Sequence, residues 1–312
     1  MVEATPGPPP EFAARIRERG SVLDMQLVKD LYAPLLAAQS TAGIAIRRDL
    51  PYGSDARQRL DIYSPEKTAS GAATANNRLP IIVFFHGGGF IRGDKSERAN
   101  VGLQLAREGF VVVVPGYRLA PAHRWPAGAA DVASVLAWLH SNATVHNGDL
   151  HRLFVSGESA GAAHVATATL LRRFHPPAGL AIAGAMLVSG IYNTRLEYLA
   201  RRQFNVATPD PRNEAYFGSD ASRYAEQSLV EHIDAAPFPL LITYAEFDLP
   251  QMQVQAGELF ARLVTQRGFD PELAVIAAHN HLTQVYSVNT GDDSLSAPLL
   301  HFVRGELRRA VP

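Results

Sequence analysis

One serine in this sequence has neighbours that suit nucleophilic chemistry. Ser159 is the centre of a Gly-Glu-Ser-Ala-Gly pentapeptide at residues 157–161. An apolar run at 153–155 precedes it and a stretch of small residues at 162–171 follows, so we expect a strand, a tight turn and a helix. Such a turn points the serine oxygen outward, where it can attack a carbonyl carbon.

A second chemical signal is the sequence His-Gly-Gly-Gly at residues 86–89, directly after the strongly apolar run 81–85. Glycines leave backbone N–H groups uncovered and let the chain approach a ligand closely. Fixed N–H donors in a dry site stabilise a developing oxyanion. A turn that closes a strand would explain one or two glycines. His86 and the third glycine favour a donor loop.

A nucleophilic serine needs a base that takes its proton, and the base needs a carboxylate that fixes its tautomer. In strand-turn-helix hydrolases the order along the chain is serine, acid, histidine. Asp248 follows an expected strand at 240–244, so it emerges at the same sheet edge as Ser159. Glu246 is the alternative acid on the same loop. A helix cap before Pro250 is the structural alternative for Asp248.

The base is expected in the loop that follows the apolar run 273–276, because this loop carries two histidines. His281 is favoured, and His279 is the alternative. The remaining histidines after the glycine loop lie on expected helices or remote loops, where a lone histidine is more often structural. They are His123, His140, His146, His151, His164, His175, His232 and His301.

These side chains need a scaffold, and the hydrophobic pattern indicates one. Short apolar runs alternate with stretches of helical spacing, which predicts an α/β fold: a mostly parallel sheet with helices on both faces. The expected strands are 60–63, 81–85, 111–114, 153–155, 185–188, 240–244 and 273–276. The expected helices are 100–108, 127–139, 160–174, 251–267 and 297–308.

The domain organisation follows from where this alternation breaks. Residues 1–50 are expected to form a flexible lead and a helical cap segment. Residues 191–236 are expected to form a lid or cap insertion, because so long an excursion beside a nucleophile favours a lid. The hydrolase core would then comprise residues 51–190 and 237–312.

The N-terminal part carries helical spacing after a proline-rich lead at residues 1–10. Helices are expected at 12–19 and 22–38, the second with Leu23, Leu27, Leu31 and Leu35 on one stripe. The structural interpretation is a helix packed on the core, and the functional one is a roof over a pocket. Residues 68–78 are expected to form a surface loop.

Composition excludes several classes of protein. The chain has 312 residues, of which 47% are hydrophobic and 19% charged, so it is neither disordered nor fibrous. A formal net charge of -1 gives no basic field for nucleic acid or an anionic membrane. The absence of cysteine excludes disulfides, thiolate metal sites and a cysteine nucleophile.

The sequence also bears on the location and the partners of the protein. The N-terminus is too polar for a secretory signal, and no apolar run reaches transmembrane length, so we expect a cytoplasmic protein without stable membrane insertion. The expected chemistry needs no metal and no organic cofactor. The expected partner is a small-molecule ester, and a homodimer is compatible with the sequence without being indicated by it.

With these motifs in order, the chain resembles the hormone-sensitive-lipase-like esterases of the α/β-hydrolase fold. The resemblance rests on residues 86–89, on Tyr-Arg-Leu-Ala-Pro at 117–121 and on residues 157–161. It implies a serine carboxylesterase that forms an acyl-enzyme. It also implies roles: Ser159 is the nucleophile, His281 the general base and acid, and Asp248 the orienting carboxylate.

The resemblance further implies an oxyanion hole in the glycine loop and at the helix start. Its donors would be the N–H groups of Gly88, Gly89 and Ala160, with Gly87 shaping the loop. An apolar acyl or aryl site is suggested by nearby side chains, although such residues are more often core than ligand wall. The candidate substrate contacts are Phe90, Glu158, Tyr192, Phe217 and Leu249.

Other motifs look more like bacterial aryl and feruloyl esterase-like proteins related to kynurenine formamidases. They are Leu-Asp-Ile-Tyr-Ser-Pro at 60–65, Arg-Gly-Asp-Lys-Ser at 92–96 and His-Asn-His-Leu at 279–282. Two alternatives to ester hydrolysis therefore remain. One is arylformamidase or amidase activity at the same site, and the other is a non-catalytic small-molecule binding protein on the same fold.

Overall fold

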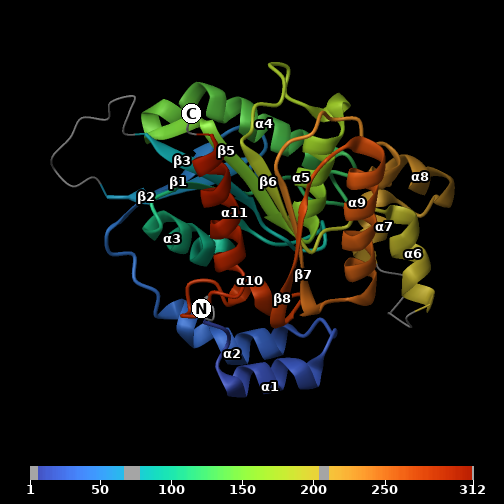
Figure 1. Ribbon diagram of the computed structural model, residues 1–312, viewed down its shortest axis with the longest axis horizontal. Helices are drawn as coiled ribbons and strands as arrows, with labels where there is room; N and C mark the ends of the chain where they lie inside the picture. The colour runs from blue at the N-terminus through green and yellow to red at the C-terminus, as the bar shows by residue number, and fades with distance from the viewer. Residues whose placement is uncertain (1–5, 67–77, 204–210, 311–312) are drawn as a thin grey trace.

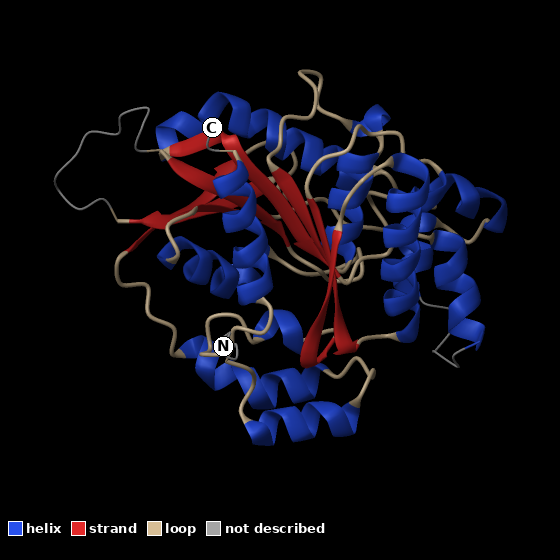
Figure 2. Ribbon diagram, in the orientation of Figure 1, coloured by secondary structure: helices blue, strands red, loops and turns tan. Residues whose placement is uncertain are grey.

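The chain folds around one mostly parallel sheet (Figures 1 and 2). The computed structural model describes residues 6–66, 78–203 and 211–310, and within them the sheet has eight strands in the order β1-β2-β4-β3-β5-β6-β7-β8. β1 pairs antiparallel with β2, and β2 with β4, whereas the other pairs are parallel. The strands are β1 (Ile44–Pro51), β2 (Arg59–Pro65), β3 (Leu79–Phe85), β4 (Val111–Pro115), β5 (Gly148–Glu158), β6 (Gly184–Val188), β7 (Leu240–Phe247) and β8 (Glu272–Asn280).

Helices cover both faces of this sheet, as the alternating pattern predicts. Along β3, Ile82 and Phe84 point to one face, and Ile81, Val83 and Phe85 point to the other. Both sets are buried, which is why the strand reads as a continuous apolar run. The first face is covered by α3 (Ala99–Arg107) and α11 (Ser296–Arg309), and the second by α4 (Ala127–Asn142), α5 (Ala160–Leu170) and α9 (Pro250–Arg267).

The sheet begins earlier than the predicted core boundary at residue 51. β1 is an edge strand that pairs with β2 from Ile44 onward. Of its eight residues only Ile44 is buried, so the strand carries no apolar run that a sequence pattern could reveal. All seven predicted strands are present, and β1 is the additional one.

The N-terminal segment forms two helices that pack beneath the end of β8 (Figure 1). α1 (Pro10–Arg19) starts inside the predicted lead, and α2 (Met25–Ala37) starts three residues later than expected. The reason for the later start is Asp24, whose side chain accepts hydrogen bonds from the N–H groups of Gln26 and Leu27 and so caps α2. Of the predicted leucine stripe, Leu27 and Leu31 are buried, whereas Leu35 is exposed.

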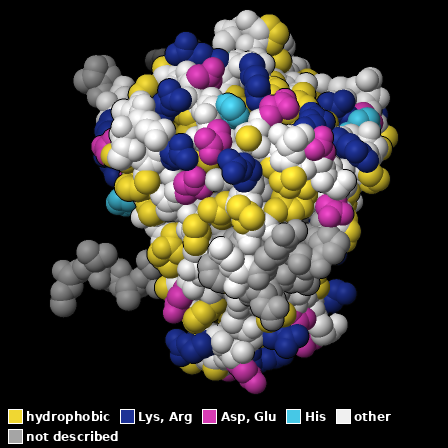
Figure 3. Space-filling model, turned by 90° about the vertical axis from the view of Figure 1, so that its right-hand side faces the viewer, with side chains coloured by type: hydrophobic (Ala, Val, Ile, Leu, Met, Phe, Trp, Pro, Cys, Tyr) yellow, Lys and Arg dark blue, Asp and Glu magenta, His cyan; other side chains and the backbone are white. Residues whose placement is uncertain are grey.

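A long excursion leaves the sheet after β6 and returns at β7. It contains α6 (Thr194–Gln203), α7 (Pro211–Phe217) and α8 (Tyr224–Gln227), which lie beside α9. Figure 3 shows this side of the molecule, where apolar, basic and acidic side chains are interspersed.

A buried polar network ties the excursion to α9. The side-chain oxygen of Gln255, on α9, accepts hydrogen bonds from the N–H groups of Tyr192 and Asn193, both at 2.8 Å. The amide nitrogen of Gln255 donates to Glu197 at 2.9 Å, and Asn213 donates to the same carboxylate at 3.0 Å. One carboxylate therefore joins α6, α7 and α9.

Two predictions fall largely outside the described residues: the surface loop at 68–78 and the first half of the lead. Among the helices that the structure describes, none has the length and apolar character needed to cross a bilayer.

Candidate active site

Ser159 lies on a tight turn between β5 and α5, as its pentapeptide predicts. Its backbone has φ 50° and ψ -117°, a conformation that side chains rarely adopt, and its N–H donates to the carbonyl of Val188 at 2.8 Å. The turn requires glycine at 157 and 161, because backbone atoms that cannot move aside occupy the space of a side chain at both positions. A Cβ on Gly157 would lie 2.6 Å from the carbonyl carbon of Gly161, and a Cβ on Gly161 would lie 2.3 Å from the Phe85 oxygen.

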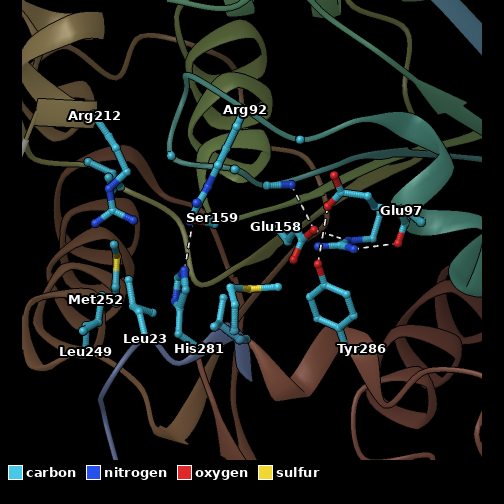
Figure 4. Close-up of a pocket in the computed structure, with 18 of the residues that line it drawn as sticks. Leu23, Arg92, Glu97, Glu158, Ser159, Arg212, Leu249, Met252, His281 and Tyr286 are labelled. Atoms are coloured by element: carbon cyan, nitrogen blue, oxygen red, sulfur yellow. Dashed lines mark hydrogen bonds and ion pairs between the residues drawn. The ribbon is translucent and has the colours of Figure 1, made fainter. Parts of the chain in front are cut away.

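Three side chains from different elements meet at this turn. His281 Nε2 lies 3.0 Å from Ser159 Oγ, and His281 Nδ1 lies 2.7 Å from Asp248 Oδ1 (Figure 4 shows the first contact). A carboxylate only accepts, so Nδ1 carries the proton toward Asp248 and Nε2 accepts from the serine hydroxyl. Asp248 follows β7, and His281 follows β8, so the parallel strands deliver both groups to the carboxyl edge of the sheet.

Burial and charge act in opposite directions on His281. Burial is the largest single influence and lowers the pKa of its imidazole, whereas the negative charge of Asp248 and the hydrogen bond to it raise the pKa. Glu158 adds to the increase, and Arg212 opposes it. The net pKa of His281 lies above its usual value of 6.5, which suits a group that must accept a proton during the reaction.

Asp248 is held by a shell of donors that the sequence did not reveal. Its second oxygen accepts from the Ser189 hydroxyl at 2.5 Å, and the N–H of Leu249 donates to its first oxygen at 2.8 Å. Gln284 in turn donates to Ser189 Oγ at 2.7 Å and to the carbonyl of His281 at 3.2 Å. Ser189 follows β6 directly, so its place at the sheet edge was the one signal that it belongs to the site.

The two alternative residues occupy other positions. Glu246 accepts a hydrogen bond from the N–H of Ala278 at 2.7 Å and thereby links the ends of β7 and β8. His279 is fully buried, with Asp292 at 3.0 Å and the Thr283 hydroxyl at 3.1 Å. Neither residue lines the cavity that holds Ser159 and His281.

The glycine loop lies beside Ser159, and two of its residues have positive φ. A Cβ on Gly88, at φ 132°, would lie 2.0 Å from the Arg92 oxygen, and Gly89 has φ 59°. The N–H of Gly87 donates to Glu158 Oε1 at 2.9 Å, so this amide is already engaged. An engaged amide suits the loop-shaping role expected of Gly87, and the candidate oxyanion donors are the N–H groups of Gly88, Gly89 and Ala160.

The glycine loop packs against a pair of aromatic side chains from two of the sequence motifs, His86 and Tyr117. Their rings are stacked 4.3 Å apart, and the Tyr117 hydroxyl donates to the carbonyl of His86 at 2.8 Å. Burial lowers the pKa of His86 to about 4, so the imidazole is neutral at pH 7. His86 is thus a packing residue of the loop.

Glu158 lines the cavity, as expected, but its carboxylate is engaged with the protein. It forms a buried ion pair with Arg98 in addition to the bond from Gly87. The Arg98 guanidinium lies 4.4 Å from the centre of the Tyr286 ring. We therefore assign Glu158 to holding the glycine loop against the serine turn.

The cavity around Ser159 has a volume of about 300 Å³. Leu249 lines it, as predicted. Phe90, Tyr192 and Phe217 do not, and their proposed substrate contacts are wrong in this structure. Phe90 stacks on Tyr216 at 4.4 Å and packs against Phe217, and Tyr192 is buried in the core below the sheet edge.

Several lining residues were not predicted as substrate contacts from the sequence. Leu23 and Met25 reach the cavity from the N-terminal segment, which agrees with a roof over the pocket. The others are Arg92, Glu97, Arg98, Ile191, Arg212, Asn213, Met252, Leu282 and Tyr286, several of which come from segments far from the motifs. Within the described part of the chain, no group of three or more histidine and acidic side chains is placed to hold a metal ion.

A serine on a strand-turn-helix junction, bonded to a histidine that is bonded to a carboxylate, is the arrangement of the serine hydrolases built on α/β sheets. Residues 82–284 match the family described as alpha/beta hydrolase fold, and the chain belongs to this family. The predicted class, a hormone-sensitive-lipase-like α/β hydrolase, is confirmed.

Individual relatives are esterases. Esterase LipC of Mycobacterium tuberculosis is 34% identical over 116 residues, which are 37% of this chain and 27% of LipC. Carboxylesterase NlhH of the same species is 42% identical over 91 residues, or 27% of each protein. The matches therefore cover little more than a quarter of these relatives.

The solved structures extend the likeness to the whole fold. A structure described as a bacterial heroin esterase superimposes with a TM-score of 0.74, at 24% identity, over 96% of this chain and 98% of its own. At this identity the similarity concerns the fold.

Proposed function

We propose that the protein is a serine carboxylesterase that hydrolyses small acyl or aryl esters through an acyl-enzyme. The observation that carries the proposal is the continuous chain of contacts from Ser159 through His281 to Asp248 at the wall of the cavity. The esterase relatives support the same class of reaction.

In the first half of the reaction, Ser159 Oγ attacks the ester carbonyl carbon while its proton passes to His281 Nε2. Negative charge develops on the carbonyl oxygen, and the N–H groups of Gly88, Gly89 and Ala160 are the proposed donors to it. Asp248 stabilises the imidazolium that forms. The tetrahedral intermediate then collapses, and His281 returns the proton to the departing alcohol.

In the second half, water takes the place of the alcohol. His281 removes a proton from this water, which attacks the acyl carbonyl and passes through a second oxyanion at the same donors. Collapse releases the carboxylic acid and restores the Ser159 hydroxyl. The proposed substrate is thus a small ester, and the excursion after β6 is the proposed cap, because α7 contributes Arg212 and Asn213 to the cavity wall.

The test is replacement of the nucleophile. Ser159→Ala is expected to lower kcat/KM for p-nitrophenyl butyrate by roughly 10³-fold or more, because no other group forms the acyl-enzyme. Ser222→Ala, an exposed serine in the excursion, is the matched control and should keep wild-type activity. A fluorophosphonate should label the wild type and the control but not the Ser159 variant. Wild-type turnover by Ser159→Ala would exclude this mechanism.

The same purified wild type and variants also test the two alternatives, an arylformamidase and a non-catalytic binding protein. An arylformamidase would turn over N-formylkynurenine faster than an aryl ester, whereas the esterase relatives favour the ester. A non-catalytic binding protein would resist the fluorophosphonate. The short contact between Ser159 and His281 argues against it, because that contact activates the serine.

A further inference from the structure

Two arginines that the proposed mechanism does not use line the cavity around Ser159. Arg92 belongs to the segment that follows the glycine loop, and Arg212 belongs to α7 of the excursion. Both side chains are directed toward the neighbourhood of Ser159 and His281 in Figure 4. Guanidinium groups at the wall of a reaction cavity favour a ligand with negative charge.

Arg212 is fixed close to the reacting groups by its packing. A Cβ on Gly89 would lie 2.8 Å from Arg212 Cδ and 3.4 Å from its Cβ, so the stem of this arginine lies directly on the glycine loop. Its positive charge also lowers the pKa of His281, which places the guanidinium within electrostatic range of the imidazole. Arg212 thus contacts the candidate oxyanion loop and influences His281.

The acidic residues that line the cavity lie on the side away from Arg212 (Figure 4), where they bond to other residues of the protein. Glu158 is paired with Arg98, and Glu97 accepts a hydrogen bond from Tyr286. Figure 4 shows these groups on one side of Ser159 and Arg212 on the opposite side. Within the residues that the structure describes, the Arg92 side chain has no carboxylate partner.

Apolar side chains surround the basic side of the cavity. Leu249 and Met252 lie near Arg212 in Figure 4, and Leu23 lies next to them. This side therefore offers a short apolar wall and a positive charge, which suits a short carbon chain or ring that carries an anionic group. A purely aliphatic acyl chain would leave both charges without a partner from the substrate.

We propose that the cavity selects esters that carry a carboxylate, such as monoesters of short dicarboxylic acids or acylated hydroxycarboxylates, and that Arg212 and Arg92 bind this carboxylate. The proposal rests on the esterase function proposed above and names its substrate class. Hydrogen bonds to charged groups contribute about 1.5–3 kcal/mol, which corresponds to roughly 10- to 150-fold in kcat/KM.

The experiment compares charged and neutral esters of the same shape. The first pair is monomethyl glutarate and its amide, methyl glutaramate, which places the charge on the acyl side. The second pair is 4-acetoxybenzoate and 4-acetoxybenzamide, which places it on the alcohol side. We expect the anionic member of at least one pair to have a kcat/KM at least 10-fold higher, measured by acid release in a pH-stat.

Variants assign the preference to the arginines. Arg212→Gln and Arg92→Gln should each lower kcat/KM for the preferred anion at least 10-fold more than for its neutral partner, and Arg212→Lys should restore part of the preference by restoring the charge. Arg223→Gln is the matched control, because it removes an exposed arginine of the excursion that does not line the cavity.

A second readout tests the position of Arg212 independently of the substrate. With phenyl acetate, Arg212→Gln should move the acidic limb of the kcat/KM profile to higher pH, because a charge that lowers the pKa of His281 is removed. Equal or better turnover of the neutral member in both pairs overturns the substrate proposal and leaves the esterase intact. No turnover of any ester, phenyl acetate included, overturns the proposed function itself.

Discussion

Asp248 sets both the orientation and the proton affinity of His281. Its carboxylate is fully buried and accepts hydrogen bonds from His281, Ser189 and the backbone of Leu249. Without this carboxylate, the imidazole would lose the largest influences that raise its pKa, and burial would disfavour its charged form. The acid therefore has two separable effects, one on the rate and one on the pH dependence.

Asp248→Asn should change both quantities. The maximal kcat should fall by roughly 10⁴-fold, because an amide favours the wrong imidazole tautomer. The remaining activity should have its acidic limb at lower pH than the wild type, since the Asp248 charge, which raises the pKa of His281, is lost and burial, which lowers it, remains. The measurement is kcat/KM for p-nitrophenyl butyrate between pH 5 and 9.

Glu246→Gln is the control for this prediction, because it changes the neighbouring acid in the same way. It should retain most of the activity, since Glu246 bonds to the backbone of Ala278 and not to an imidazole. The reverse pattern, with a large loss only in Glu246→Gln, would assign the orienting role to Glu246.

The sequence narrowed the acid and the base to two candidates each but could not separate them by pattern. Glu246 and Asp248 lie two residues apart at the end of β7, and His279 and His281 lie two residues apart at the end of β8. Which of each pair faces Ser159 depends on how β7 and β8 end, and the register of this pair shifts between Ala245 and Phe247. Such an irregularity leaves no mark in the hydrophobic pattern.

At the scale of elements, the junction of β5 with α5 depends on glycines at 157 and 161. α5 starts so close to the end of β3 that Gly161 has the carbonyl oxygens of Phe85 and His86 as neighbours. Those oxygens lie at the end of β3, where the glycine loop begins. The contact of Gly161 with them therefore sets the distance between the nucleophile and the candidate oxyanion donors, and this contact requires a residue without a side chain.

Gly161→Ala should therefore separate the two motifs. The new methyl group would lie 2.3 Å from one backbone oxygen and 2.6 Å from another, and neither can rotate away. We expect the free energy of unfolding to fall by about 1–3 kcal/mol and kcat/KM to fall at least tenfold. Chemical denaturation and ester hydrolysis measure the two effects.

The matched control is Gly257→Ala on α9, where a Cβ would meet no atom within 4 Å. Alanine should stabilise this helix by about 0.5–1 kcal/mol without a change in activity. If both variants behaved alike, the close approach of α5 to β3 would have no role in positioning the site.

Patterns of hydrophobicity predicted the elements better than the side chains that face the substrate. The central strands are buried on both faces, so the sequence shows them as apolar runs, whereas the exposed edge strand β1 has no such run. Phe90 follows the glycine loop directly, yet it has φ 70° and its ring turns into the core. Its position in the sequence correctly predicted that Phe90 lies near the site, but the direction of its ring depends on packing in the folded protein.

At the scale of the whole molecule, the cavity is assembled from seven separated stretches of chain. Leu23 and Met25 come from the N-terminal segment, and the other walls come from residues 87–98, 158–159, 191, 212–213, 249–252 and 281–286. Packing of α1 and α2 against Phe247, Leu282 and Tyr286 holds the N-terminal wall in place. Contacts this distant in sequence have no local signature, so the lining could not be predicted residue by residue.

Leu23→Ser should alter substrate binding more than chemistry. The side chain contributes an apolar wall and has no group that can exchange a proton or attack a carbonyl, so KM for p-nitrophenyl butyrate should rise several-fold while kcat changes by less than about twofold. Val22→Ser is the control, because Val22 is adjacent but 52% exposed. A large fall in kcat with unchanged KM would contradict a wall function for Leu23.

The carboxylate of Glu197, which joins α6, α7 and α9, also has a kinetic consequence. Displacing the excursion as a unit would break the bonds that Gln255 of α9 forms with Glu197, Tyr192 and Asn193, and the buried carboxylate would lose its donor on α9. Large opening motions of this region should therefore be too rare to limit turnover. We expect kcat to be nearly independent of solvent viscosity when sucrose is added, whereas an inverse dependence would mean that turnover waits for the excursion to move.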